Sequence, residues 1–223
     1  MNDDSLERIA AEIVACHQCP RLVAWREQVA GEKRAAYRDW EYWGKPVPGF
    51  GDPEARILVV GLAPAAHGGN RTGRVFTGDR SGDWLYGSMH RAGVASQATS
   101  EHRDDGLTLL GAYVSAAVRC APPENKPLPE ERDACQPFLD REIALLTQLR
   151  VVVPLGAFAL DAVSRLFQVR PKLKFGHGIE HRLRDGRLVV CSYHPSQHNT
   201  FTGRLTTPMF DAIFRRAAEL AAG

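Results

Sequence analysis

The apolar positions of the chain fall into two kinds of segment. Four short segments are almost wholly apolar and rich in β-branched residues, which predicts buried strands at residues 56–62, 112–118, 151–156 and 187–193. Longer segments repeat apolar residues at helical spacing, which predicts helices at residues 83–92, 130–149, 157–167 and 206–221. Strands without polar alternation, separated by helices, are typical of parallel sheets covered on both faces. We therefore predict an α/β fold, a three-layer α/β/α arrangement with a central four-stranded parallel sheet.

The segment before the first strand has a different character. Residues 4–30 show helical spacing that a turn at residues 16–20 interrupts, and residues 31–54 contain glycine, proline and tryptophan without a clear period. The chain has no internal repeat, low-complexity tract or linker-like segment. We therefore expect a single domain over residues 1–223.

Composition excludes several classes of protein. The 223 residues are 44% hydrophobic and 24% charged, which is enough apolar material for a packed core and excludes general disorder. The sequence has no run of about 18 apolar residues. Its N-terminus lacks the basic start and apolar block of a secretory signal. We expect a cytoplasmic protein that does not enter a membrane.

The charged residues are strongly biased toward arginine. The formal net charge is only +2, but the chain contains 23 Arg and 5 Lys. Arginine binds phosphate in a bidentate fork, so this bias is compatible with a nucleic-acid partner. The arginine-rich codons of a GC-rich genome would produce the same bias.

Four of the five cysteines form two pairs with the features of a metal site. Cys16 and Cys19 have C-x₂-C spacing, and Cys120 and Cys135 both lie beside prolines, which suit loops held away from regular structure. Four thiolates fit either a tetrahedral zinc ion or an iron–sulfur cluster, and spacing does not separate the two. A redox pair and ordinary buried thiols are the alternatives. Cys191 lies in an apolar run and is predicted to be a core thiol.

The loop after the first predicted strand, residues 61–79, contains five glycines, whose exposed amides suit an anion or a planar ligand. It is not a P-loop, because no Gly-Lys-Ser/Thr closes it. Phe76 stands in a polar context, where it either stacks on a ligand or anchors the loop. Asp79 precedes a predicted helix, so it is either an N-cap or a carboxylate directed into a cleft.

Two further loops carry polar groups at the same edge of the predicted sheet, where α/β folds bind ligands. Asn125 follows the second strand and offers both a donor and an acceptor to a base edge, or else serves a turn. His194 leaves the fourth strand and is followed by Pro195, a position suited to chemistry. The same loop is rich in phosphate-compatible donors, at Gln197, Asn199, Thr200, Thr202 and Arg204.

Taken together, these motifs resemble the family-5 uracil-DNA glycosylases, the iron–sulfur branch found in bacteria and archaea. The resemblance spans nearly the whole chain and rests on Cys16-x₂-Cys19, GLAPAAHGGNRTGRVFTGD from residue 61, AAVRCAPPENKP from residue 116, Cys135 and YHPSQHNTFTGRL from residue 193.

The resemblance implies an enzyme that removes uracil, and often other deaminated bases, from DNA. It implies a structural [4Fe–4S] cluster on Cys16, Cys19, Cys120 and Cys135. A flipped base would stack on Phe76 and meet Asn125 at its edge, within a base-binding set of Phe76, Gly61, Ala63 and His67. His194 would stabilise the uracil anion as the glycosidic bond breaks. We expect DNA contacts from Arg71, Arg74, Ser196, Asn199 and Arg204.

One departure from related families bears on the mechanism and on specificity. Residues 61–66 read Gly-Leu-Ala-Pro-Ala-Ala and lack the polar or acidic residue that other glycosylase families carry there. Asp79 is the favoured residue for orienting the water or stabilising the sugar cation, and His67 is a second candidate. Fewer polar contacts to the base also suggest hypoxanthine as an extra substrate. No lysine is placed for lyase chemistry, so we expect a monofunctional, monomeric enzyme.

Three other functions remain open at this point. A DNA-binding module with a structural metal would bind DNA and leave uracil in place. A family-4-type glycosylase would remove uracil alone, although the inserted AAHGGNRTGR segment argues against it. A zinc hydrolase is the weakest alternative, because four cysteines would close the coordination shell.

Overall fold

A computed structural model describes residues 4–223, so the first three residues of the predicted domain lie outside the description. The sheet has six strands in the order β1-β3-β2-β4-β6-β5. The four inner strands are parallel and are those expected from the sequence: β2 (Ile57–Gly61), β3 (Ala112–Ala116), β4 (Val151–Pro154) and β6 (Leu188–Val190).

The predicted four-stranded sheet needs one correction, because two short antiparallel strands extend its edges. β1 (Phe50–Gly51) pairs with β3, and β5 (Glu180–Arg182) pairs with β6. They have two and three residues and are half-buried or exposed, so neither produces an apolar run. Their position at the edges explains their absence from the hydrophobic pattern.

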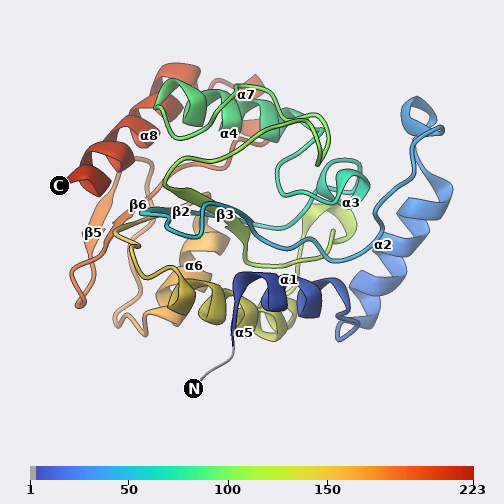
Figure 1. Cartoon of the computed structure of the whole chain (residues 1–223), viewed down its shortest axis with the longest axis horizontal. Helices are drawn as coiled ribbons and strands as arrows, with labels where there is room; N and C mark the ends of the chain where they lie inside the picture. The colour runs from blue at the N-terminus through green and yellow to red at the C-terminus, as the bar shows by residue number, and fades with distance from the viewer. Residues whose placement is uncertain (1–3) are drawn as a thin grey trace.

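Helices cover both faces of the sheet, as predicted (Figure 1). One face carries α4 (Arg80–Arg91) and α8 (Thr207–Ala222). The other carries α5 (Pro129–Leu145) and α6 (Ala157–Leu166), with α1 (Leu6–Val14) packed on α5. Side chains of β2 alternate between the two cores, since Ile57 and Val59 face α4 and α8 while Leu58 and Val60 face α5 and α6. Every residue of β2 is therefore buried, which is why the strand reads as a continuous apolar run.

The remaining elements are short or lie beside the sheet. α2 (Pro20–Glu32) follows α1 after the turn at Cys16–Cys19, with Pro20 at its first position. The other short elements are η1 (Ala35–Tyr37), α3 (Gly69–Thr72), η2 (Pro123–Asn125) and α7 (Gln197–Phe201). Within residues 4–223 no helix is both long and apolar enough to span a membrane.

A buried ion pair joins Arg119, which follows β3, to Glu142 on α5. Arg119 donates from Nη2 to Oε2 of Glu142 at 2.6 Å, and both side chains are 1% exposed. Ser115 also donates to Oε2 of Glu142, at 2.7 Å. Because Arg119 directly precedes Cys120, this pair anchors the start of the loop that leaves β3.

The Glu142→Ala variant should lose about 3–5 kcal/mol of the free energy of unfolding, because it leaves the buried Arg119 charge without its carboxylate. Urea unfolding followed by circular dichroism measures this loss. Glu124→Ala is the matched control, since it removes a carboxylate that pairs with Lys126 on the surface. It should leave the unfolding midpoint nearly unchanged, and equal losses in the two variants would contradict the buried role of Glu142.

Candidate functional site

The loops after β2, β3 and β6 surround a cleft of about 560 Å³ at one edge of the sheet. This volume is in the range of small-molecule sites. Twelve residues line the cleft: Leu62, Ala63, Ala65, Phe76, Asp79, Arg80, Ser81, Asn125, His194, Ser196, Gln197 and His198. The structure thus brings together Phe76, Asp79, Asn125 and His194, which sequence reasoning drew from three separate loops.

Phe76 forms one wall of the cleft because two glycines make room for it. A Cβ on Gly61 would lie 2.6 Å from the Phe76 ring, and a Cβ on Gly82 would lie 2.0 Å from the Phe76 carbonyl oxygen. Phe76 itself has a φ of 49°, an uncommon value for an aromatic residue. Its ring centroid is 5.9 Å from that of His194, with 35° between the planes. Gly61 supports this wall from behind, whereas Ala63 lines the cleft directly.

Asp79 is both an N-cap and a cleft residue, so the two interpretations of its sequence context are compatible. Its Oδ1 accepts hydrogen bonds from the amides of Ser81 at 2.9 Å and Gly82 at 3.1 Å, which begins α4. Its Oδ2 lies against Gly68, where a Cβ would come within 1.9 Å of it. Burial raises the pKa of Asp79, although the two amides act to lower it. The carboxylate is therefore fixed in orientation at the cleft.

His194 presents a neutral imidazole to the cleft. Burial lowers its pKa to about 4, so the ring is uncharged at neutral pH. The loop around it is held by its own side chains, since Asn199 donates from Nδ2 to the His194 carbonyl at 2.8 Å. Ser196 caps α7 by accepting from the Asn199 amide at 3.3 Å. A neutral ring can donate one hydrogen bond without carrying a charge.

Asn125 lies at the mouth of the cleft on the loop after β3. It is exposed and has a φ of 55°, directly after Glu124 with a φ of 54°. Asparagine tolerates this left-handed region better than most residues do. Asn125 thus serves a turn and lines the cleft, just as Asp79 caps a helix and lines the cleft.

Two expected DNA contacts are corrected, because Arg71 and Arg74 lie inside the protein. Arg74 is 4% exposed and pairs with Asp105 at 2.7 Å. Arg71 is 3% exposed, and its Cζ lies 4.0 Å and 4.1 Å from the ring centroids of Tyr37 and Trp40.

Both arginines brace the glycine-rich loop from within. Arg71 donates to the carbonyls of His67 and Gly78 at 2.8 Å and 2.7 Å. The Arg74 Nε donates to Thr77 Oγ1 at 2.9 Å. An irregular loop has few backbone partners for its polar groups, and these guanidinium groups supply them. Neither is exposed enough to reach a DNA phosphate.

One further expectation, the base contact of His67, is corrected, and Asn199 has a partner inside the protein. His67 lies outside the lining of the cleft, and its Nδ1 is 3.0 Å from the Tyr42 hydroxyl. Asn199 donates one side-chain N–H to the His194 carbonyl, which supports the loop, and the DNA contact expected of Asn199 stays a prediction. By contrast, Arg204 is exposed over the Tyr193 ring, and Ser196 lines the cleft.

Sequence reasoning missed two residues at the rim of the cleft. Phe201 is 67% exposed, the most exposed of the large hydrophobic residues in the described chain. The Arg80 Cζ lies 4.4 Å from the Phe201 ring centroid, and Arg80 lines the cleft. The available signal was a phenylalanine in the otherwise polar stretch at residues 196–204.

The four paired cysteines gather at a second place, around a small enclosed cavity lined by Cys16, Cys19, Cys120 and Cys135 together with Arg26 and Arg119. The turn between α1 and α2, the loop after β3, and α5 supply these sulfurs. Burial raises the pKa of Cys120 to about 12 and that of Cys135 to about 11. Within residues 4–223, no three Cys, His, Asp or Glu side chains converge closely enough to hold a single metal ion. All four cysteines nevertheless line this one cavity, and four thiolates are the donor set that a zinc ion or an iron–sulfur cluster takes.

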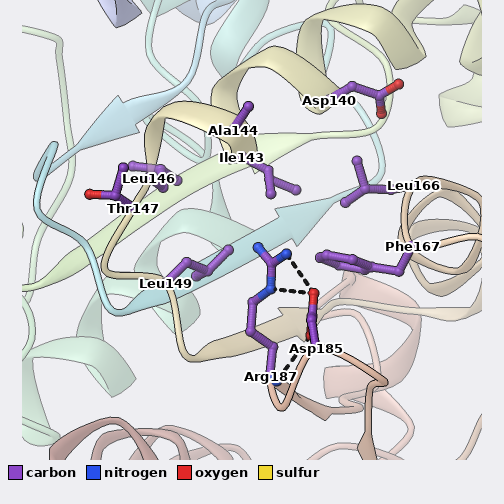
Figure 2. Close-up of a pocket in the computed structure, with 10 residues that line it drawn as sticks. All are labelled: Asp140, Ile143, Ala144, Leu146, Thr147, Leu149, Leu166, Phe167, Asp185 and Arg187. Carbon is purple, nitrogen blue, oxygen red and sulfur yellow. Dashed lines mark hydrogen bonds and ion pairs between the residues drawn. The ribbon is translucent and has the colours of Figure 1, made fainter.

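Cys191 confirms its predicted role as a core thiol. It is 0% exposed and packs in the core beneath α5 and α6, directly after β6. Another hollow lies between α5, α6 and the turn before β6, away from the three loops (Figure 2). Its charged residues are already paired, since Arg187 donates to Asp185 and stacks on Phe167. This hollow therefore offers no comparable set of reactive groups.

Comparisons with known proteins agree with this arrangement. The family model for the uracil DNA glycosylase superfamily matches residues 48–218. A type-5 uracil-DNA glycosylase of Thermus thermophilus is 53% identical over 216 residues, covering 96% of this chain and 98% of that protein. A type-5 enzyme of Mycobacterium tuberculosis is 51% identical over 220 residues, covering 97% and 82%. A type-4 uracil-DNA glycosylase of Sulfurisphaera tokodaii is 27% identical over 199 residues, covering 86% and 75%.

The His194 ring should titrate near pH 4, well below the ordinary histidine value of 6.5. As the pH falls through 6.5 the unfolded chain takes up this proton first, so the stabilisation from neutral His194 is complete above pH 6.5 and declines toward pH 4. An NMR titration of the ring protons, assigned by comparison with His194→Gln, measures the midpoint. A midpoint near 6.5 would contradict the burial of the ring.

Proposed function

Because this chain belongs to the uracil-DNA glycosylase superfamily and to its type-5 branch, we propose that it removes uracil from DNA by hydrolysing the N-glycosidic bond. One observation carries the proposal: a stacking ring, an amide, a neutral imidazole and a fixed carboxylate meet in one cleft. These are the groups needed to hold a planar base and to stabilise charge on both sides of the broken bond. The product is a free base and an intact abasic strand.

The target nucleotide has to leave the duplex before it can react. The glycosidic bond is inaccessible inside stacked DNA, so such enzymes extrude the base into a pocket. Phe76 stacks on the face of the extruded base, a contact that tolerates different bases. Phe201 is exposed beside the cleft with Arg80 on its ring, and we propose that it fills the gap left in the stack.

Asn125 recognises the edge of the base. Its amide supplies a donor and an acceptor, which match the adjacent carbonyl and N–H of uracil. Its position at the cleft mouth suits contact with a base that has already entered. The donor and acceptor together favour a base with both groups on one edge.

His194 stabilises the leaving group. Cleavage places negative charge on the base, and the imidazole N–H donates to the oxygen where that charge develops. This hydrogen bond strengthens in the transition state, so it lowers the barrier. A charged imidazolium would hold an anion that the base has to displace. The neutral ring holds none.

Asp79 acts on the sugar side. Its carboxylate is held by two amides and by contact with Gly68, so it enters the reaction already oriented. There it orients the attacking water and stabilises the sugar cation. Asp79, oriented by the first turn of α4, takes the place of the acidic residue that is missing from residues 61–66.

Contacts to the DNA backbone come from exposed groups around the cleft. We assign Arg204, Ser196 and Arg80 to the phosphates. The net charge of +2 is small, so affinity depends on these local groups. We propose that the protein acts as a monomer on chromosomal DNA.

We also propose that Cys16, Cys19, Cys120 and Cys135 hold a [4Fe–4S] cluster. The lining of one small cavity by all four cysteines supports a shared site, and the resemblance to the iron–sulfur branch favours a cluster over a single zinc ion. When bound, the cluster supplies a rigid cross-link. It joins the α1–α2 turn to the loop after β3, which carries Asn125, and to α5.

The cleft further supports a range of deaminated bases that includes hypoxanthine. Leu62, Ala63 and Ala65 line it with apolar groups in place of directed polar contacts. A hydrophobic wall discriminates weakly between bases of different size. The chain is 53% identical to the type-5 relative and 27% identical to the type-4 relative. This difference favours the broad range of substrates proposed here over removal of uracil alone.

Base excision from labelled duplexes tests the proposed activity. One duplex contains a single uracil and the other a single hypoxanthine, and alkali reveals abasic sites. We expect cleavage of both, with strands intact until alkali is added. Cleavage of uracil alone would overturn the broad range. DNA binding without cleavage of either would replace the enzyme with a binding module, and nicking without alkali would contradict monofunctional chemistry.

Substitutions in the cleft should slow single-turnover excision while DNA binding persists. We expect about 10²–10³-fold for His194→Ala, about 10²-fold for Asp79→Asn and about tenfold for Asn125→Ala. Matched controls are His181→Ala on β5 and Asp185→Asn near β6, which lie outside the cleft. Wild-type rates in the three cleft variants would remove these assignments.

A further inference from the structure

Arg26 is a buried cation without a buried carboxylate. It lies on α2 and is 1% exposed, and arginine stays protonated in proteins. Within residues 4–223 its one ion pair is with Glu27 at 3.6 Å, and the Glu27 side chain is 55% exposed. A buried charge is costly unless an anion compensates it. The surroundings of Arg26 therefore require negative charge from another source.

The contacts of Arg26 identify that source. Its Nη1 donates to the Cys120 Sγ at 3.1 Å and to the Cys16 carbonyl at 3.2 Å. It thus touches one member of each cysteine pair and lines the cavity between them. Cysteine is a weak acceptor as a thiol and a strong one as a thiolate.

A second arginine lines the same cavity. Arg119 is also 1% exposed, and Glu142 holds its Nη2. Its Nε and Nη1, together with the Nε of Arg26, are buried with no acceptor in the described chain. Buried N–H groups almost always have a partner, so three orphan donors beside one cavity point to acceptors within it.

We propose that Arg26, assisted by Arg119, is the charged outer-sphere partner of the iron–sulfur cluster and protects it against oxidation. This inference rests on the cluster proposed above. Four thiolates and a core of charge +2 sum to −2, and N–H groups near the sulfurs stabilise that charge. Loss of one electron lowers the negative charge, so a nearby cation opposes the loss. Removing the Arg26 charge makes the cluster easier to oxidise.

The test uses the full-length protein purified without oxygen. Iron and acid-labile sulfide are measured first. Ferricyanide is then added; it takes one electron from each cluster and becomes ferrocyanide, and the oxidised cluster then loses iron, so that its visible absorption bleaches. Arg26→Gln should bleach the visible absorption of the cluster about tenfold faster than wild type, the scale of one charge-assisted hydrogen bond. The cluster potential, measured by voltammetry, should fall in the same variant.

Two further variants separate charge from packing. Arg26→Lys keeps the charge but loses the planar fork, and it should bleach near the wild-type rate. Arg216→Gln removes an exposed charge on α8 and should change nothing. Arg119 is left intact, because its removal would isolate Glu142 in the interior. Thermal unfolding of each variant verifies that it has folded.

The outcomes distinguish the two proposals. Zinc in place of iron and sulfide in the wild-type protein overturns the cluster, and with it the role of Arg26. Iron and sulfide in wild type, with the same bleaching rate and potential in Arg26→Gln, overturns the role of Arg26 alone. Equal sensitivity of Arg26→Lys and Arg26→Gln assigns Arg26 to packing and also overturns the proposal.

Discussion

The parallel register of the four inner strands is the constraint on which the rest of the molecule depends. Residues of β2 pair in order with those of β3, up to Gly61 opposite Ala116, and with those of β4. Parallel pairing brings the carboxyl ends of the strands to one edge, so loops distant in sequence meet there. A shift of one residue would turn every core side chain to the other face. Asn125 and His194 therefore share a cleft because the hydrogen bonds between the parallel strands bring their loops together, although neither residue belongs to a strand.

The glycine-rich loop meets this edge with a rigid structure of its own. Glycines at positions 61 and 68 allow Phe76 and Asp79 to approach closer than any Cβ would permit. Arg71 and Arg74 turn inward to satisfy the loop, which removes them from the surface. Preorganisation of the wall and of the carboxylate thus keeps these two arginines from the surface, and the proposed DNA contacts are assigned to exposed residues elsewhere. Rigid placement is worth more at the reacting atoms than at the phosphates.

The cavity lined by the four paired cysteines is linked to the glycine-rich loop by direct contacts. The Asn70 side chain on α3 donates to the Arg26 carbonyl at 3.1 Å, and Arg26 in turn contacts Cys120. On the other side of the cavity, Arg119 joins Cys120 to Glu142 of α5. A group bound by the four sulfurs therefore adjoins both the loop carrying Phe76 and the loop carrying Asn125. This continuity gives a physical reason why the proposed cluster would support the candidate cleft from outside it.

The sequence by itself determined the features that depend on neighbouring residues. Apolar periodicity located the four inner strands, for example β2 at Ile57–Gly61 within the predicted 56–62, and it separated the helices that cover them. Local context also offered Asp79 as a helix cap or a cleft carboxylate, and the motifs identified the family. Periodicity persists along the chain because each buried element needs its own apolar face.

Only the tertiary structure decided where the polar side chains point. Arg74 turns toward Asp105, Arg71 toward Tyr37 and Trp40, and His67 toward Tyr42, all partners distant in sequence. The edge strands β1 and β5 likewise exist through pairing with β3 and β6. Polar side chains and edge backbone form hydrogen bonds with whatever the fold brings near, and no local pattern records that choice.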